Sequence, residues 1–348
     1  MSRRALIVGI GGQDGSYLSE LLLSKGYEVY GLVRHSVAQL PERIAHLHGR
    51  VQLVRADLLD QLSLINAVQT ARPHEVYNFA GTSFVPESWQ QPAMSVEVTG
   101  MGVVRLLEAI RVTDASIRFY QASTSEMFGR PDVAPQTESS PFDPQNPYAV
   151  AKLFGHQMVQ RYREGFDLFA VSGILYNHES PRRGLEFVTR KITNAAARIA
   201  LGLDEQVALG DLDARRDWGF AGDYVHAMWL MLQQESPESY VIASGSLRSV
   251  REVAEVAFAH VQLDWRDYVV VDDRFRRRDD VAASLVGDAS RARERLGWQP
   301  EVDFEELIRL MVEADVARLD AEQEYGPQCD WPSVGRPLSL EGTSPESR

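Results

Sequence analysis

Tyr148 and Lys152 have the residue types and the spacing of a proton-transfer pair. Residues four apart on a helix lie on one face, so the ammonium group is expected beside the phenol. An isolated tyrosine has a pKa of about 10. A neighbouring ammonium favours the phenolate, and we expect Lys152 to lower the pKa of Tyr148 so that it can act as a base near neutral pH. The pair predicts redox chemistry at a hydroxyl or carbonyl group.

A hydroxyl and a carboxylate follow a predicted strand further up the chain. Thr124 and Glu126 lie in the segment QASTSEMFG, residues 121–129. A simple alcohol dehydrogenase needs only a hydroxyl beside its Tyr–Lys pair. The added Glu126 therefore indicates a second proton transfer, although a solvated loop acid would explain it equally well if it stood alone.

A glycine-rich loop follows the first apolar run of the chain, with Gly9, Gly12 and Gly15 at its turns and Gln13 and Asp14 between them. The first glycine permits a tight turn, the second lets the backbone approach a pyrophosphate, and the third lets a helix pack on a strand. The N-terminus of the following helix favours phosphate. This placement predicts dinucleotide binding, with a plain glycine-rich turn as the alternative.

The residue after the second predicted strand selects between the two nicotinamide dinucleotides. An acid there would bind a ribose 2′-hydroxyl, but Arg34 occupies the position and suits a 2′-phosphate, so we expect NADP. The competing explanation is an ordinary solvated arginine. Asp57 follows the third strand, where an acid can meet the adenine amino group. It could equally serve as the N-cap of the next helix.

Short β-branched runs alternate with helical patterns through the first half of the chain. We expect strands over 5–9, 27–33, 52–55, 75–80, 117–122 and 168–174, and helices over 17–25, 58–72, 98–112 and 147–166. This alternation predicts an α/β fold with a Rossmann-type doubly wound parallel sheet. Such sheets bind ligands at the carboxyl ends of their strands, where the glycine loop, Thr124 and Glu126 would meet.

The alternation breaks after about residue 176. Helices are expected over 189–201 and 249–261, and a strand over 240–243 that returns to the main sheet. We expect an NADP-binding domain over 1–175, with returning elements near 209–245, and a smaller mixed α/β substrate-binding lobe over 176–323. Residues 324–348 are rich in Pro, Ser, Gly and Glu, which predicts a poorly ordered tail.

The composition excludes several classes of function. A net charge of −13 disfavours binding to nucleic acid or to anionic membranes. An anionic ligand would therefore need a local group of Arg and Lys. Cys329 is the single cysteine, so no intrachain disulfide can form, and we expect no metal site. No signal-peptide pattern follows Met1 and no apolar run is long enough to span a bilayer, so we expect a cytoplasmic protein.

Taken together, six segments resemble the GDP-mannose 4,6-dehydratase family, a group of extended short-chain dehydrogenases/reductases. The resemblance covers about residues 4–318, and its later segments are specific to that group. The matching segments are GxxGQDGSYLxELLLxKGYEV at 9–29, YQASTSEMFG at 120–129, NPYAVAKL at 146–153, GILYNHESPRRGLEFVTRKI at 173–192, LGDLDARRDWGFAGDYVHAMWLMLQ at 209–233 and LGW at 296–298.

The resemblance implies conversion of a GDP-sugar, with GDP-mannose favoured, to a 4-keto-6-deoxy product. Tyr148 would take the proton of the carbon-4 hydroxyl, whose oxygen Thr124 would hold, while hydride passes to NADP. Lys152 would hold the nicotinamide ribose and assist Tyr148. Glu126 would remove the proton at carbon 5, and Glu126 or Tyr148 would act as the acid when water leaves carbon 6. The hydride would then return to carbon 6.

The resemblance also implies two sets of binding residues and a homodimer or homotetramer. The cofactor set is Gly9, Gly12, Gln13, Asp14, Gly15, Arg34, Asp57, Leu58, Ala80, Tyr148, Lys152 and His178. The substrate set is Ser83, Asn177, Glu179, Arg183, Val188, Lys191, Gly210, Arg216 and Arg278. Glu179 has an alternative role as the ion-pair partner of Arg182 or Arg183.

The chain departs from the family pattern in three places. His35 stands where the family has a second arginine that contributes to cofactor binding and to tetramer contacts. Residues 81–83 read Gly-Thr-Ser where the family reads Ala-Gln-Ser. Val281 and Ala283 stand where the family has acids, the first of which contacts the nucleotide ribose; Arg278 is retained. These departures bear on the identity of the nucleotide and the sugar more than on the chemistry.

Two other classes of function compete. One is another nucleotide-sugar enzyme on the same scaffold: a 4-keto reductase, an epimerase, or a dehydratase acting on a different sugar or nucleotide. Glu126 argues against a pure reductase, which needs no base at carbon 5. The other is a catalytically inactive dinucleotide-binding protein, against which the intact set of Thr124, Glu126, Tyr148 and Lys152 argues.

Overall fold

The computed structural model describes residues 2–34, 42–81, 83–275 and 285–325. Its main sheet has seven parallel strands in the order β10-β6-β5-β4-β1-β2-β3. The predicted Rossmann-type sheet is confirmed, including the strand that returns from the second half of the chain. The strands are β1 (Arg4–Val8), β2 (Glu28–Val33), β3 (Val51–Arg55), β4 (Glu75–Asn78), β5 (Arg118–Thr124), β6 (Ala170–Leu175) and β10 (Tyr240–Ile242).

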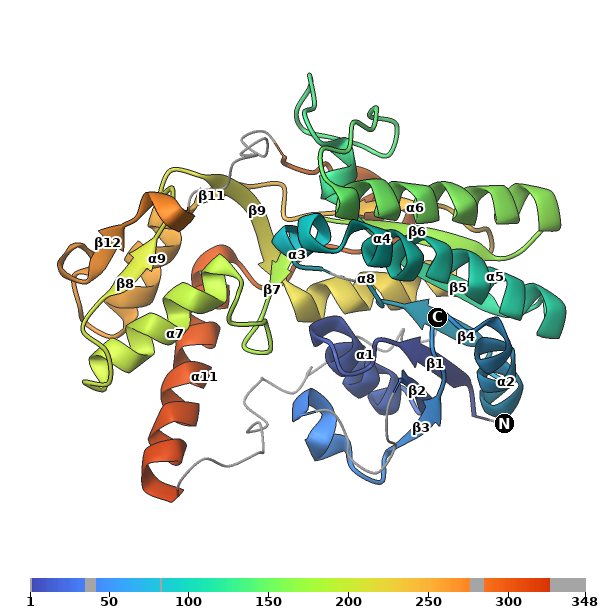
Figure 1. Cartoon of the computed structure of the whole chain (residues 1–348), viewed down its shortest axis with the longest axis horizontal. Coiled ribbons are helices and arrows are strands. Elements are labelled where there is room, and N and C mark those ends of the chain that lie inside the picture. Colours follow the sequence, from blue (N-terminus) through green and yellow to red (C-terminus); the bar gives the residue numbers. More distant parts are fainter. Residues whose placement is uncertain (1, 35–41, 82, 276–284, 326–348) are drawn as a thin grey trace, which may run out of the picture.

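Helices cover both faces of this sheet (Figure 1). Alternate side chains of β1 point to opposite faces, Ala5 and Ile7 to one and Leu6 and Val8 to the other. One face packs against α1 (Gln13–Ser24), α8 (Ala221–Gln233) and α10 (Ser290–Leu296). The other packs against α2 (Gln61–Ala71), α5 (Gly102–Thr113) and α6 (Pro147–Phe166). Two apolar cores therefore hold the sheet rigid beneath its carboxyl edge.

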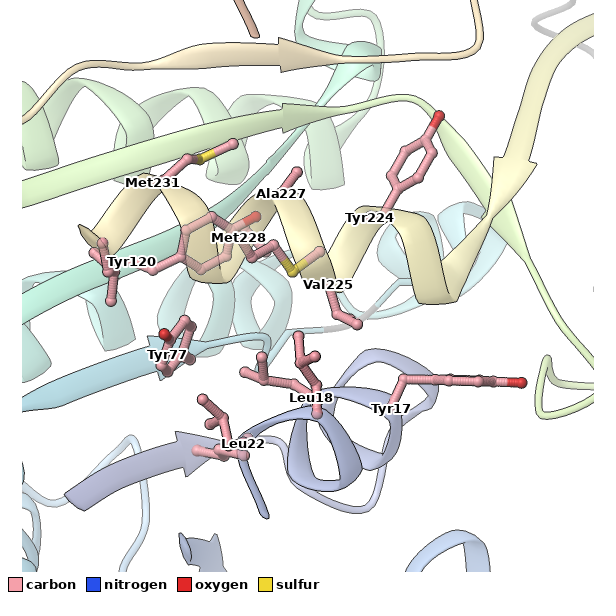
Figure 2. Close-up of a cluster of buried hydrophobic side chains, with 14 of the residues drawn as sticks. Tyr17, Leu18, Leu22, Tyr77, Tyr120, Tyr224, Val225, Ala227, Met228 and Met231 are labelled. Atoms are coloured by element: carbon pink, nitrogen blue, oxygen red, sulfur yellow. The ribbon is translucent and has the colours of Figure 1, made fainter. Parts of the chain in front are cut away.

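Helix α8 was not among the predicted helices, yet it lies at the centre of one core. Figure 2 shows Met228 of this helix beside Tyr120 of the sheet, and both belong to one apolar cluster with Met231, Tyr77 and Leu18. Most side chains of α8 are buried around its circumference. The sequence of such a helix is largely apolar on all sides, so it lacks the 3.6-residue apolar period that identifies surface helices.

The remaining elements form a smaller lobe, at the left of Figure 1. Its helices α7 (Val188–Ala200), α9 (Val250–His260) and α11 (Phe304–Tyr325) share one apolar cluster. The guanidinium group of Arg190 on α7 forms a buried ion pair with Asp315 on α11. The lobe strands are β7 (Asn177–Glu179), β9 (Arg215–Phe220) and β11 (Leu247–Ser249) in one sheet, and β8 (Val207–Leu209) and β12 (Val269–Val271) in another.

Short elements complete the described part of the chain. They are the α-helices α3 (Val85–Gln90) and α4 (Pro92–Ser95), a π-helical turn over Val96–Met101, and 3₁₀ turns over Glu42–Leu47, Ser125–Phe128, Trp265–Asp267 and Asp273–Phe275. Helix α11 continues to Tyr325, beyond the predicted start of the tail, and residues 326–348 lie outside the described residues. Among the described helices, none combines the length and apolar character needed to cross a membrane.

Candidate active site

The glycine loop lies at the carboxyl end of β1. Strands β2 and β3 extend the sheet on one side of β1, and β4, β5, β6 and β10 extend it on the other, so the strand order reverses at β1. Gly9 has a φ angle of +92°, a backbone conformation that residues other than glycine rarely adopt. A Cβ atom on Gly15 would lie 2.4 Å from the carbonyl oxygen of Gly9, so the helix approaches the strand as closely as the backbone allows. A Cβ on Gly12 would lie 3.3 Å from the same oxygen. The loop thus presents bare backbone at the N-terminus of α1.

The loop is tied to the segment after β6 through Gln13. Its side-chain amide donates to the carbonyl oxygen of His178 at 3.0 Å, and its carbonyl oxygen accepts from the Ser180 hydroxyl at 2.7 Å. The neighbouring Asp14 carboxylate pairs with the His178 imidazole at 3.0 Å. Three of the predicted cofactor residues are therefore joined in one network.

Helix α6 begins where its sequence predicts, and it carries the Tyr–Lys pair. Asn146 caps it by accepting from the Ala149 backbone N–H, and Pro147 occupies the first turn, where no N–H is needed. Tyr148 and Lys152 are both buried on the face toward β5. The Lys152 ammonium donates to the carbonyl oxygen of Ala122 at 2.8 Å and lies 5.7 Å from the centre of the Tyr148 ring.

The expectation that Lys152 lowers the pKa of Tyr148 is wrong for this structure. Burial raises the pKa of Tyr148 to about 12; the Thr124 hydroxyl opposes this shift and the Glu126 carboxylate adds to it. Burial also lowers the pKa of Lys152 to about 8. Burial dominates the pKa of Tyr148, and the Lys152 ammonium does not offset it because it donates to the Ala122 carbonyl oxygen.

Thr124 and Glu126 lie at the carboxyl end of β5, beside the N-terminus of α6. The Thr124 hydroxyl accepts from the Glu126 backbone N–H at 3.3 Å and so caps the 3₁₀ turn that follows the strand. One oxygen of the Glu126 carboxylate accepts from the side-chain amide of Asn146 at 3.1 Å. A hydroxyl, a carboxylate and a phenol are thus held on β5, the 3₁₀ turn that follows it and α6.

These groups line a single cavity of about 140 Å³. It brings together all four residues predicted to be catalytic, and predicted binding residues join them from the glycine loop, from the segment after β4 and from β7. The lining includes Asp14, Ser83, Ser123, Thr124, Glu126, Tyr148, Lys152, Asn177, His178, Arg183 and Phe187.

A second cavity of about 120 Å³ lies within the lobe, where residues of β7 and of β9 contribute to its lining. Its lining includes Asn177, Glu179, Val188, Gly210 and Arg216, five of the nine predicted substrate residues, together with Phe187, Trp218 and Phe275. Asn177 and Phe187 line both cavities. The two cavities are therefore adjacent and share these two lining residues.

The structure describes two of three further predicted cations, Arg183 and Lys191, and each lies over an aromatic ring that lines a cavity. Arg183 lies over the ring of Phe187 at 3.5 Å and its Nε atom is 3.2 Å from the carboxylate of Glu179, the alternative role considered for that acid. Lys191 is not among the residues that line the cavity; its ammonium donates to the Ala208 carbonyl oxygen at 2.6 Å and lies over the Phe275 ring. Arg278, the third, lies outside the described residues.

The remaining predicted cofactor residues are spread along the edge of the sheet beside β1. Arg34 is exposed after β2, Ala80 is half-buried after β4, and Leu58 is buried in the core. Asp57 is not the N-cap of α2: it accepts from the Leu59 N–H in a local turn, and Asp60 caps the helix instead. His35, Thr82, Val281 and Ala283 lie outside the described residues.

Several residues of the site were not predicted from the sequence. Asn146 could have been found, because Asn before Pro at the start of a helix is a common N-cap signal. Phe187 borders both cavities, and its residue type alone gives no such signal. No group of three or more His, Cys, Asp or Glu side chains suited to a metal occurs in the described ranges.

Comparison with known proteins assigns the family. A family model described as GDP-mannose 4,6 dehydratase matches residues 6–311. GDP-mannose 4,6 dehydratase 2 of Arabidopsis thaliana is 49% identical over 324 residues, which cover 90% of this chain and 86% of that protein. The Homo sapiens GDP-mannose 4,6 dehydratase is 45% identical over 339 residues, covering 90% of this chain and 91% of that protein.

Solved structures agree with this assignment at the level of the fold. The UDP-glucose 4-epimerase of Thermus thermophilus, solved in complex with NAD, superposes with a TM-score of 0.76 at 26% identity. The match covers 90% of this chain and 98% of the epimerase. With the family model and the two relatives spanning most of its length, the chain belongs to the GDP-mannose 4,6 dehydratase family.

Proposed function

We propose that the protein is a GDP-mannose 4,6-dehydratase that converts GDP-D-mannose to GDP-4-keto-6-deoxy-D-mannose and water, with NADP as a cofactor regenerated in each turnover. One observation carries the proposal: Thr124, Glu126, Tyr148 and Lys152 line one cavity, and that cavity shares Asn177 and Phe187 with a second one. The sugar would occupy the first cavity and the nucleotide the second.

The glycine loop fits a dinucleotide. Gly9 has a positive φ and Gly15 leaves no space for a side chain, and the loop opens onto the N-terminus of α1, which favours phosphate. Arg34 stands exposed after β2, with a charge and a planar donor group suited to a 2′-phosphate, which supports NADP over NAD. The related epimerase of Thermus thermophilus was solved with NAD, and a nicotinamide cofactor is therefore consistent with this scaffold.

Bound NADP would accept a hydride from carbon 4, add positive charge that favours the Tyr148 phenolate, and return the hydride to carbon 6. Tyr148 takes the proton of the carbon-4 hydroxyl, and Thr124 orients that oxygen. Lys152 binds the nicotinamide ribose. These roles fit the positions of the three side chains around the same cavity.

The second half of the reaction belongs to Glu126. Once carbon 4 is a ketone, the proton at carbon 5 is acidic and Glu126 removes it. The carbon-6 hydroxyl then leaves with a proton as water. Glu126 and Tyr148 have each taken one proton, and between them they return one to the departing hydroxyl and one to carbon 5. The protons therefore balance, and only water is lost.

The decisive experiment is to incubate the NADP-loaded protein with GDP-mannose in deuterium oxide. We expect a product lighter by one water, carrying solvent deuterium at carbon 5. An epimerase would leave the mass of the sugar nucleotide unchanged apart from exchange, and a 4-keto reductase would consume reduced cofactor. No conversion of GDP-mannose despite tight binding of NADP would overturn the proposal. A panel of other nucleotide sugars would then identify the substrate.

We also propose that the protein assembles as a homodimer or homotetramer. Trp89, Met94, Val150 and Phe154 are exposed apolar side chains on α3, α4 and α6, and α6 packs against both of the short helices. Such a group of side chains favours burial against another chain. Light scattering after gel filtration would give the mass in solution. A monomer at micromolar concentration would refute the assembly.

A further inference from the structure

Asn146 connects the two elements that carry the catalytic groups. It is buried, 7% exposed, between the 3₁₀ turn after β5 and the first turn of α6. Its side-chain oxygen accepts from the Ala149 N–H at 2.8 Å, and its side-chain nitrogen donates to the Glu126 carboxylate at 3.1 Å. Both ends of one amide group are therefore in use.

The helix end fixes which way this amide points. The Ala149 N–H can only donate, so the amide must present its oxygen there and its nitrogen to the other side. A carboxylate can only accept while it is ionised, so the amide nitrogen is the complementary partner for Glu126. Because its oxygen caps α6, the Asn146 side chain presents its NH₂ group to the Glu126 carboxylate.

Glu126 is consequently held at two points. Its backbone N–H donates to the Thr124 hydroxyl, and its carboxylate accepts from Asn146. The second contact joins it to α6, two residues before Tyr148. We propose that Asn146 is a positioning residue: it holds the Glu126 carboxyl group in register with the helix that carries Tyr148 and Lys152. This inference rests on the proposed function of Glu126 as the base at carbon 5.

The variant that tests this is Asn146→Asp. Aspartate caps helices as well as asparagine does, so α6 keeps its cap. The variant loses the amide donor and sets a second carboxylate against Glu126, which disfavours the ionised form. Because the cap is kept, we expect a melting temperature closer to that of the wild type than Asn146→Ala gives, and a kcat about 10- to 100-fold lower, with KM for GDP-mannose little changed. We also expect the acid limb of the pH–rate profile to move to higher pH.

Two further variants separate positioning from folding. Asn146→Ala loses both contacts, so its melting temperature and kcat should both fall. Asn66→Asp on the exposed surface of α2 adds the same charge far from the site and should match the wild type in both. Deuterium incorporation at carbon 5 should slow in Asn146→Asp more than hydride transfer does, as measured by the transient absorbance of the reduced cofactor.

A readout without turnover keeps the test independent of the substrate. The carbon-13 signal of the Glu126 carboxyl group, identified by its loss in Glu126→Gln, should titrate at higher pH in Asn146→Asp than in the wild type. An unshifted signal together with wild-type kcat would overturn the positioning role. If the wild type does not convert GDP-mannose, the proposed function fails, and the carboxyl titration still decides whether Asn146 holds Glu126.

Discussion

The Nε2 atom of His178 lies 3.0 Å from both carboxylate oxygens of Asp14, in the first turn of α1. Its Nδ1 atom lies 2.8 Å from the carbonyl oxygen of Tyr176. Both ring nitrogens thus face acceptors, an arrangement that suits the doubly protonated imidazolium. Burial lowers the pKa of His178, but the attraction and hydrogen bonding of Asp14 outweigh it, and the pKa is raised. The same pairing outweighs the effect of burial on Asp14, whose pKa is lowered.

This pair predicts a loss of stability at alkaline pH. A histidine whose pKa is raised on folding stabilises the protein fully below its unfolded value of 6.5, and the contribution disappears as pH rises through the higher folded value. We expect a loss of about 1 to 3 kcal/mol above that window, the scale of a buried charged hydrogen bond. Melting temperatures of the wild type and of His178→Asn, measured from pH 6 upward, test this. Parallel curves for the two proteins would refute it.

Replacing Lys152 with methionine should stabilise the fold while abolishing activity. Burial holds the pKa of Lys152 at about 8, below its ordinary 10.5, so the folded state is penalised for keeping the charge at neutral pH. The Ala122 carbonyl oxygen would keep the Gln121 side-chain amide as a donor at 2.9 Å. We expect a gain of about 1 to 3 kcal/mol in the free energy of unfolding at pH 7.

Urea unfolding measures this gain, and its dependence on pH provides the control. The wild type becomes more stable as pH rises from the folded pKa of about 8 toward 10.5, because its buried lysine loses its proton. The advantage of the methionine variant should therefore shrink above pH 8. A variant less stable than the wild type at pH 7 would show that Lys152 contributes net stability.

The third glycine of the loop should not tolerate alanine. A Cβ atom on Gly15 would lie 2.4 Å from the Gly9 carbonyl oxygen and 2.6 Å from the Cα atom of Ile10, both of which are backbone atoms. We expect Gly15→Ala to cost about 1 to 3 kcal/mol of stability and to weaken binding of NADP.

The matched control for that substitution is Gly165→Ala near the end of α6. Outside its chain neighbours and the backbone of its own helix, no atom lies within 4 Å of a Cβ built there, and its φ is negative. The helix should gain about 0.5 to 1 kcal/mol, since alanine orders more readily than glycine. Calorimetry and NADP titration of both variants test the pair. Equal effects of the two substitutions would contradict the close approach at Gly15.

Charge reversal at Arg34 should change the preferred cofactor. Arg34→Asp removes the expected partner of the 2′-phosphate and offers an acceptor to a free ribose hydroxyl. We expect Kd for NADP to rise about 10- to 100-fold and Kd for NAD to stay the same or fall. Arg72→Asp, exposed at the end of α2, controls for net charge. Equal weakening of both cofactors would assign Arg34 to a contact that they share.

Patterns that depend on neighbours along the chain were predictable. The parallel strands appeared as short apolar runs, and α6 began at Pro147 and ended at Phe166 as predicted, because Asn146, Pro147 and the apolar period lie within one segment. The motif residues Thr124, Glu126, Tyr148 and Lys152 also meet in one cavity, since a parallel sheet gathers its carboxyl ends at one edge.

Features that depend on tertiary contacts were not predictable. The acceptor of the Lys152 ammonium is a backbone carbonyl on β5, thirty residues away in sequence, which no side-chain pattern reveals. Asp57 and Asp60 are both plausible caps by residue type, and only the start of α2 at Gln61 selects Asp60. Helix α8 lacks an apolar period because the sheet and the surrounding helices bury most of its circumference.

Asn177 and Phe187 belong to one short stretch of chain that leaves β6 and borders both cavities. Sugar chemistry and nucleotide recognition are therefore not separable modules, even though the lobe has its own apolar cluster. A chimera in which a relative's sequence replaced the lobe after Phe187 would keep Asn177 and Phe187 of this chain beside a nucleotide cavity formed by the relative's residues. An exchange made before it would bring foreign residues against Asp14 and Tyr148. A change of substrate preference that involves this shared wall would therefore alter both halves of the site at once.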